Sequence, residues 1–141
     1  RGAASYLDSY VFKSPGSAEL QQAGWTVRPH WRGNLFANWA KGLWAVTVSE
    51  RILGESYRLN PPDLMDDAKA PVVAYTNLNL RYDLGGEGAS KELFLNISNL
   101  FDRDPEVMGS NGQSLAYNTY TQSAYYDMVG RSFTVGARIK Y

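Results

Sequence analysis

Nine residues at the C-terminus decide the fold, and they read Phe133, Thr134, Val135, Gly136, Ala137, Arg138, Ile139, Lys140 and Tyr141. Every odd position is apolar or aromatic, and every even position is polar, charged or glycine. Because successive side chains of a strand point to opposite faces, this stretch predicts a strand with one apolar and one polar face. The final aromatic residue continues the apolar face. This pattern is typical of the last strand of an outer-membrane β-barrel, with the odd residues facing lipid and the even residues facing the lumen.

The composition narrows the functional classes. The chain has 141 residues and a formal net charge of zero, so its charge points to no nucleic-acid partner. It has no cysteine and one histidine, which argues against a disulfide, a thiolate metal site or a cysteine nucleophile. The mean hydropathy is −0.38, and no stretch approaches the roughly 20 apolar residues of a membrane helix. This criterion does not apply to the strands of a membrane barrel, because only every second residue of such a strand contacts lipid.

Alternation along the whole chain predicts six strands, over residues 3–12, 27–39, 43–51, 72–84, 91–99 and the terminal stretch. In the first, Tyr6, Asp8, Tyr10 and Phe12 would share one face. In the second, one face would carry Trp31, Gly33, Leu35, Ala37 and Trp39. The opposite face would carry Arg28, His30, Arg32, Asn34 and Asn38, with Phe36 as an exception. The fold class expected is therefore all-β and antiparallel, a transmembrane β-barrel segment.

The connections alternate in length, which indicates hairpin topology with two unequal rims. Short turns are expected at 40–42 and 85–88, and long loops after residue 14, over 54–71 and between the last two strands. Outer-membrane barrels have short periplasmic turns and long extracellular loops. The short turns should then lie on the rim of the C-terminus. Near that rim fall Trp39, Trp44, Tyr82 and Tyr141, and we expect the first three to form a periplasmic aromatic girdle.

Two motifs near the C-terminus carry a family resemblance. The run from Leu95 to Asp102, Leu-Asn-Ile-Ser-Asn-Leu-Phe-Asp, resembles the "NLFD" signature of TonB-dependent outer-membrane receptors. A second motif resembles that family's approach to its final aromatic residue and comprises Tyr126, Asp127, Gly130, Arg131, Phe133, Val135 and Gly136. Residues 29–42 and 51–54 are similar to the preceding hairpin of the family. The terminal Tyr141 stands where phenylalanine is commoner.

The resemblance implies a transporter rather than an enzyme. Members of the family import scarce ligands such as metal chelates, cobalamin or oligosaccharides, and the TonB complex supplies the energy through an N-terminal plug inside a 22-stranded barrel. Residues 1–141 would be the C-terminal portion of that barrel, without the plug and the earlier strands. The implied partners are those missing parts, TonB, outer-membrane lipid of a Gram-negative bacterium and the barrel-assembly machinery. That machinery would recognise an assembly signal of Phe133, Ile139 and Tyr141.

Few residues suggest ligand chemistry. In the expected extracellular loop before the last strand, Tyr117 and Tyr120 offer rings and hydroxyls suited either to a small ligand or to an outer aromatic girdle. For Tyr125 and Tyr126, next to the last strand, the girdle is expected. His30 is expected to be a lumen-facing polar residue. Asp63, Asp66 and Asp67 lack the spacing of a calcium loop, and we expect a solvated acidic loop. No cofactor, metal site or catalytic constellation is expected.

Two alternatives stay open. A small structural or adhesive outer-membrane barrel needs at least eight strands, and the sequence predicts six. A soluble carbohydrate-binding β-sandwich predicts extraction without detergent, and leaves the apolar face of the terminal strand unexplained. Since open strand edges cannot satisfy their backbone groups in hydrocarbon, we expect further strands to pair with both edges of this segment.

Overall fold

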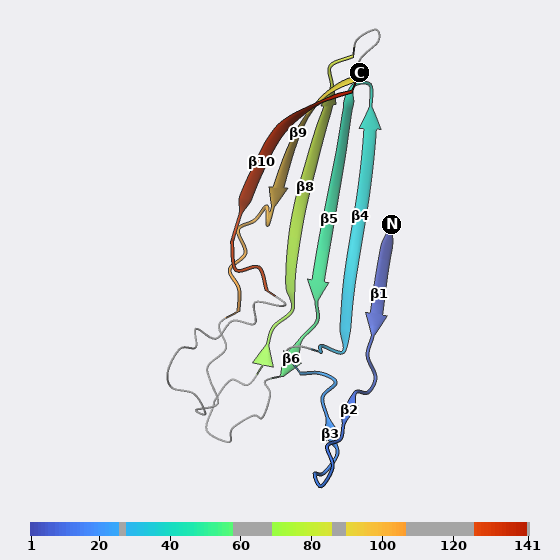
Figure 1. The fold of residues 1–141 in the computed structure, drawn as a ribbon, viewed down its shortest axis with the longest axis vertical. Helices are drawn as coiled ribbons and strands as arrows, with labels where there is room; N and C mark the ends of the chain where they lie inside the picture. Colours follow the sequence, from blue (N-terminus) through green and yellow to red (C-terminus); the bar gives the residue numbers. More distant parts are fainter. Residues whose placement is uncertain (26–27, 58–68, 86–89, 107–125, 141) are drawn as a thin grey trace.

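The computed structural model describes residues 1–25, 28–57, 69–85, 90–106 and 126–140, and these residues form an all-β structure (Figure 1). Its main feature is a six-stranded antiparallel sheet in the order β1-β4-β5-β8-β9-β10. The strands of this sheet are β1 (Gly2–Tyr6), β4 (Trp31–Lys41), β5 (Trp44–Leu53), β8 (Val73–Asp83), β9 (Ser90–Ser98) and β10 (Ser132–Lys140). Two short hairpins accompany it, β2 (Val11–Phe12) with β3 (Leu20–Gln21) and β6 (Ser56–Tyr57) with β7 (Lys69–Ala70).

The six expected strands and their antiparallel order are confirmed, but the first one is shorter than predicted. Residues 3–12 do not form one strand, because β1 ends at Tyr6 and β2 belongs to a separate hairpin. Beyond the last pair, Tyr6 with Trp31, the backbone N–H of Leu7 still bonds to the carbonyl of His30. Further along, the chain enters the hairpin of β2 and β3, where the backbone N–H of Gln22 donates a hydrogen bond to the carbonyl of Tyr10. The predicted shared face of Tyr6, Asp8, Tyr10 and Phe12 is therefore wrong.

The second strand begins later than predicted. The prediction began it at residue 27, whereas β4 begins at Trp31 and continues to Lys41, which pairs with Trp44. The turn between β4 and β5 is therefore Gly42–Leu43, and Gly42 takes the positive φ of 59° that favours glycine in two-residue hairpins. The expected loop over 54–71 also contains β6 and β7, which the sequence analysis did not predict.

Cross-strand register gives each face of the sheet a distinct chemistry. Residues directly opposite each other share a face, so one row joins Trp39, Val46, Leu80, Leu95 and Val135 across five strands. The neighbouring row of the same face joins Ala37, Val48, Leu78, Ile97 and Phe133. We call this the apolar face, and the opposite side of the sheet the polar face. The alternation predicted from the sequence for β4 and β10 is confirmed by this register.

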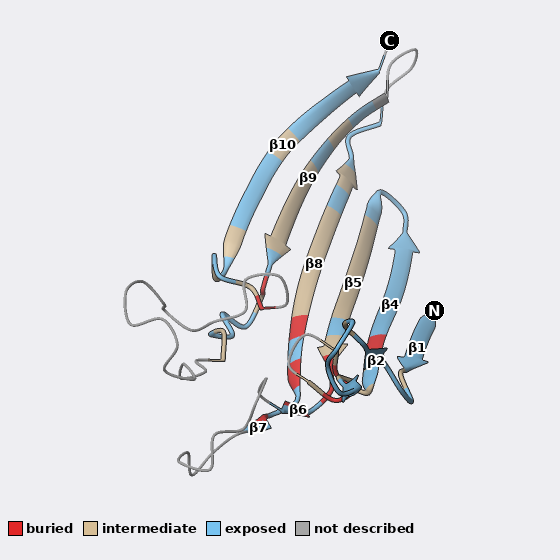
Figure 2. Cartoon of the chain, turned by 60° about the horizontal axis from the view of Figure 1, so that its bottom comes forward, coloured by how far each residue is buried: buried red, intermediate tan, exposed pale blue. Residues whose placement is uncertain are grey.

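Buried residues gather at the end of the sheet that carries the long connections (Figure 2). The apolar members of this long-loop core are Leu53, Ala70, Val73, Tyr75 and Tyr126. Two polar residues, Ser56 and Asn99, are buried nearby at 2% and 1% exposure. The opposite end carries the short turns and the end of β10 (Figure 1). The core therefore sits at one end of the sheet, and no second layer of described residues covers either face of its middle.

The sheet is open. Within the described ranges β1 pairs only with β4 and β10 only with β9, so both outer edges of the sheet lack a second neighbour. Residues 1–25, 28–57, 69–85, 90–106 and 126–140 contain no helix long and apolar enough to cross a membrane.

Candidate functional site

The apolar face is the largest unusual surface of the molecule. Large apolar side chains stand exposed along it, among them Leu35 at 48%, Leu93 at 44%, Phe133 at 64%, Val135 at 81% and Ile139 at 52%. An exposed apolar surface that spans six strands is far larger than the scattered apolar residues of an ordinary soluble surface. It requires an apolar environment or an apolar partner.

Three aromatic side chains gather at the short-turn end of this face. Trp44 begins β5 and faces Tyr82 near the end of β8, and their ring centroids are 4.6 Å apart. Trp39 lies two residues before the end of β4 and is 55% exposed, while Trp44 is 50% exposed. The hairpin register thus brings the three residues predicted for the periplasmic girdle to one rim of the sheet. β10 runs toward the same rim, since Lys140 pairs with Ser90 beside the turn after β8.

A second aromatic group, which the sequence analysis missed, lies at the long-loop ends of the same face. Tyr6 ends β1 opposite Trp31 at the beginning of β4, and Phe133 is the second residue of β10. Their exposures are 70%, 39% and 64%. The prediction that Tyr126 belongs to an outer girdle is wrong, because this ring is only 5% exposed and packs in the long-loop core. Burial raises the pKa of the Tyr126 hydroxyl.

The polar face carries a transverse row of amide and hydroxyl side chains. The register aligns one residue from each of five strands, namely Asn38, Thr47, Asn79, Asn96 and Thr134. Thr47 donates a hydrogen bond of 2.8 Å to the side-chain carbonyl of Asn38, and Asn79 donates one to Asn96. These polar groups are therefore partly satisfied by each other across the strands. We call this set the amide row.

Charged groups flank the amide row. Toward the short-turn end, the carboxylate of Glu92 lies 3.9 Å from the guanidinium of Arg81 and 3.6 Å from that of Arg138. Toward the long-loop end, the guanidinium of Arg51 lies over the ring of Tyr75, 5.2 Å from its centroid. Exposed ion pairs of this kind add little stability, so they describe the polarity of the face rather than its strength.

The two resemblance motifs meet at the long-loop end of β9 and β10. Asp102 accepts a 2.8 Å hydrogen bond from the backbone N–H of Arg131, and its carboxylate lies 3.7 Å from the Arg131 guanidinium. A long connection separates these partners along the chain, and its residues 107–125 lie outside the described ranges. The structure therefore gives the motifs a joint role that the sequence analysis did not predict.

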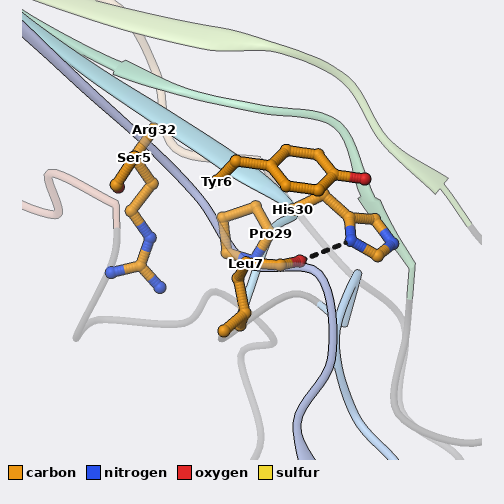
Figure 3. A pocket seen from close by; sticks show the side chains of 6 residues that line it. All are labelled: Ser5, Tyr6, Leu7, Pro29, His30 and Arg32. Carbon is orange, nitrogen blue, oxygen red and sulfur yellow. Dashed lines mark hydrogen bonds between the residues drawn. The ribbon is translucent and has the colours of Figure 1, made fainter.

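A cavity of about 280 Å³ lies at the long-loop end of β1 and β4 (Figure 3). Its lining is formed by Ser5, Tyr6, Leu7, Pro29, His30 and Arg32. His30 is the residue predicted to face the lumen, and its Nδ1 hydrogen-bonds the carbonyl of Leu7 at 2.8 Å while its ring stacks on Tyr6. These contacts give His30 a structural role. The described residues contain no group of three metal-ligating side chains.

The remaining predicted positions fall outside the described residues. These are the ligand candidates Tyr117 and Tyr120, the girdle candidate Tyr125, the terminal Tyr141 and the acidic residues Asp63, Asp66 and Asp67. Of the expected assembly signal, Phe133 and Ile139 both lie on the exposed apolar face of β10.

Comparison with models of known protein families, with curated proteins and with solved structures gave no match to this chain. The functional argument therefore rests on the residues and the geometry described above.

Proposed function

We propose that this chain forms the final six strands of an outer-membrane β-barrel transporter, energised by TonB. The observation that carries the proposal is the uncovered apolar face, which continues through the strand register from β4 to β10 and backs onto a polar face. Hydrocarbon on one side and a watery lumen on the other explain why the same strands alternate so regularly. The TonB-dependent class is supported by the resemblance of the two C-terminal motifs.

The spacing of the aromatic groups fits the thickness of a bilayer. From Trp31 to Trp39, eight residues of β4 rise about 27 Å along the strand at roughly 3.4 Å per residue. At a strand tilt of about 40° this corresponds to about 20 Å along the barrel axis, near the roughly 25 Å band of outer-membrane barrels. Aromatic rings suit both borders of that band because their apolar rings sit in hydrocarbon while N–H and O–H groups remain hydrated.

Further strands belong at both edges of the sheet under this proposal. β1 and β10 each have one partner within the described ranges. In hydrocarbon each unpaired backbone group costs several kcal/mol, so only a closed barrel is stable there. A preceding strand of the same receptor pairs with β1, and the first strand of the barrel pairs with β10. The ligand, a metal chelate, cobalamin or an oligosaccharide, passes through the lumen side of this wall.

Membrane fractionation and uptake test the proposal together. The full-length protein should be recovered in the outer-membrane fraction and require detergent for extraction. Cells with and without a working TonB complex should then be compared for uptake of ferric chelates, cobalamin and oligosaccharides, and uptake should depend on both the protein and TonB. Recovery in the soluble fraction without detergent would instead favour a β-sandwich. An outer-membrane location with an intact mass too small for 22 strands would favour a small structural barrel.

A further inference from the structure

The alternating pattern of β10 does not by itself determine the register in which this strand pairs with β9. A slip of one residue would turn the apolar residues of β10 into the lumen, so alternation excludes it. A slip of two residues keeps every side chain on its face. In the observed register Val135 lies opposite Leu95, and after such a slip Phe133 or Ala137 would take that place, still apolar against apolar. Something other than alternation must exclude the slip.

The connection between β9 and β10 does not fix the register by its length. A two-residue hairpin turn dictates which residues pair, whereas a long connection leaves many pairings geometrically open. Here the residues from 99 to 131 separate the two strands. The contacts that tie the two ends of this connection together are therefore the ones that set the pairing.

Asn99 makes the first group of these contacts, at the β9 end of the connection. It is 1% exposed and adopts a left-handed φ of 50°. Its side-chain oxygen accepts a hydrogen bond of 2.8 Å from the N–H of Arg103, and its side-chain nitrogen donates one of 3.0 Å to the carbonyl of Arg103. Its own backbone N–H donates to the side chain of Asn77 in β8. Asparagine tolerates this conformation, and the buried amide is satisfied on both sides. The corner after β9 is thus closed and anchored to the sheet.

Asp102 makes the second group of contacts, which join this corner to the start of β10. It is held in the corner by the hydrogen bond from its backbone N–H to the carbonyl of Asn99, and its carboxylate receives the N–H of Arg131, one residue before β10 begins. Gly130 turns the chain at a φ of 76°, and a Cβ at that position would lie 3.2 Å from the Asp102 carboxylate. The glycine therefore allows the close approach that the hydrogen bond needs.

We propose that Asn99 and Asp102 are positioning residues that select the register of β10 on β9. They hold Arg131 against the corner that follows Ser98, and this contact starts the ladder with Ser132 opposite Ser98. Rows from Ser132 to Lys140 then follow, and they bring the terminal residues to the short-turn rim. The link to barrel assembly rests on the proposed function, while the register itself does not.

Paired cysteines read the register directly, because the chain has no cysteine of its own. In the full-length protein, Leu95→Cys with Val135→Cys reports the observed register, and Leu95→Cys with Phe133→Cys or Ala137→Cys reports the two slipped ones. Disulfide yield is measured after mild oxidation in membranes. In the Asp102→Ala background we expect the ratio of native to slipped disulfide to fall about tenfold, as expected for loss of one charged hydrogen bond.

Matched variants separate positioning from general loss of stability. Asp102→Asn keeps an oxygen that accepts the N–H of Arg131 and should restore most of the native ratio, and Asp104→Ala, exposed in the same segment, should leave it unchanged. Should Asn99→Ala prevent folding, Asp102→Ala still decides, because it leaves the Asn99 contacts in place. An unchanged native ratio in Asp102→Ala would overturn the proposal, as would a similar fall in Asp104→Ala. Neither result depends on TonB or on uptake, so failure of the transport proposal would be seen separately.

Discussion

The two faces of the six-stranded sheet are made by the same strands and yet are stabilised in different ways. On the polar face, side chains cross-link neighbouring strands, as Thr47 does with Asn38 and Glu92 with Arg81 and Arg138. On the apolar face, residues such as Val135 stand exposed at 81%, and no described residue covers them. The polar face is therefore stabilised in part by contacts between its own side chains, whereas the described residues leave the apolar face uncovered. Substitutions that are equivalent in chemistry should therefore have unequal effects on the two faces.

The largest inequality is expected for a charge placed on adjacent residues of β10. Val135→Arg would place a guanidinium in hydrocarbon and should cost about 2–4 kcal/mol of folding free energy if the site lies near the bilayer midplane. Thr134→Arg would extend into the lumen and should change stability by no more than about 0.5 kcal/mol. Folding equilibria into lipid bilayers measure both. Equal costs for the two variants would contradict the assignment of the faces.

One strand glycine on each face, Gly136 and Gly33, gives a smaller contrast. At Gly136 on the polar face, an added Cβ would lie 2.5 Å from the ring of Phe94, so Gly136→Ala must displace that ring and should cost about 1–2 kcal/mol. At Gly33 on the apolar face, the nearest atom would be 3.8 Å away, so Gly33→Ala should be neutral or stabilise by about 0.5 kcal/mol. Denaturant titration in detergent or bilayers compares them, and a larger loss at Gly33 would refute the packing argument.

The amide row offers a contrast on the polar face itself. Asn79 and Asn96 are hydrogen-bonded to each other, so a double-mutant cycle with Asn79→Ala and Asn96→Ala should give a coupling of about 0.5–1.5 kcal/mol. The same cycle with Asn79→Ala and Asn34→Ala should give a coupling near zero, because these residues lie on non-adjacent strands. Additive effects in the first cycle would show that water replaces the hydrogen bond at no cost.

Much of this architecture could be predicted from the sequence, because alternation is a local property. The strict pattern from Phe133 to Lys140 needs no knowledge of a partner strand, and the faces it predicts agree with the register of β9 and β10. Loop lengths likewise predicted that the turn between Trp39 and Trp44 lies on the rim toward which β10 runs. In these regions the side-chain alternation and the loop lengths predict the same arrangement of strands.

Tertiary contacts account for what could not be predicted. The break after Tyr6 accompanies the separate hairpin of β2 and β3, in which the N–H of Gln22 donates to the carbonyl of Tyr10. The burial of Tyr126 depends on packing with Val73 and Tyr75, and no local sequence pattern predicts this packing. The tie between Asp102 and Arg131 joins residues 29 positions apart, so each motif alone gave no sign of its partner. The aromatic group at the long-loop ends likewise depends on the pairing of Tyr6 with Trp31.

The smallest effect on the finished fold is expected at the terminal residue. By alternation Tyr141 continues the apolar face, and its removal leaves in place every pair of the described ladder, which ends with Lys140 opposite Ser90. As part of the proposed assembly signal with Phe133 and Ile139, it would act before the barrel is complete. Deletion of Tyr141 from the full-length protein should therefore reduce the outer-membrane yield several-fold while changing the unfolding free energy of the assembled fraction by less than about 0.5 kcal/mol. Lys140→Ala, on the polar face, is the matched control and should leave the yield unchanged. Normal yield without Tyr141 would remove its role in assembly, and a large loss of stability would make it an ordinary structural residue.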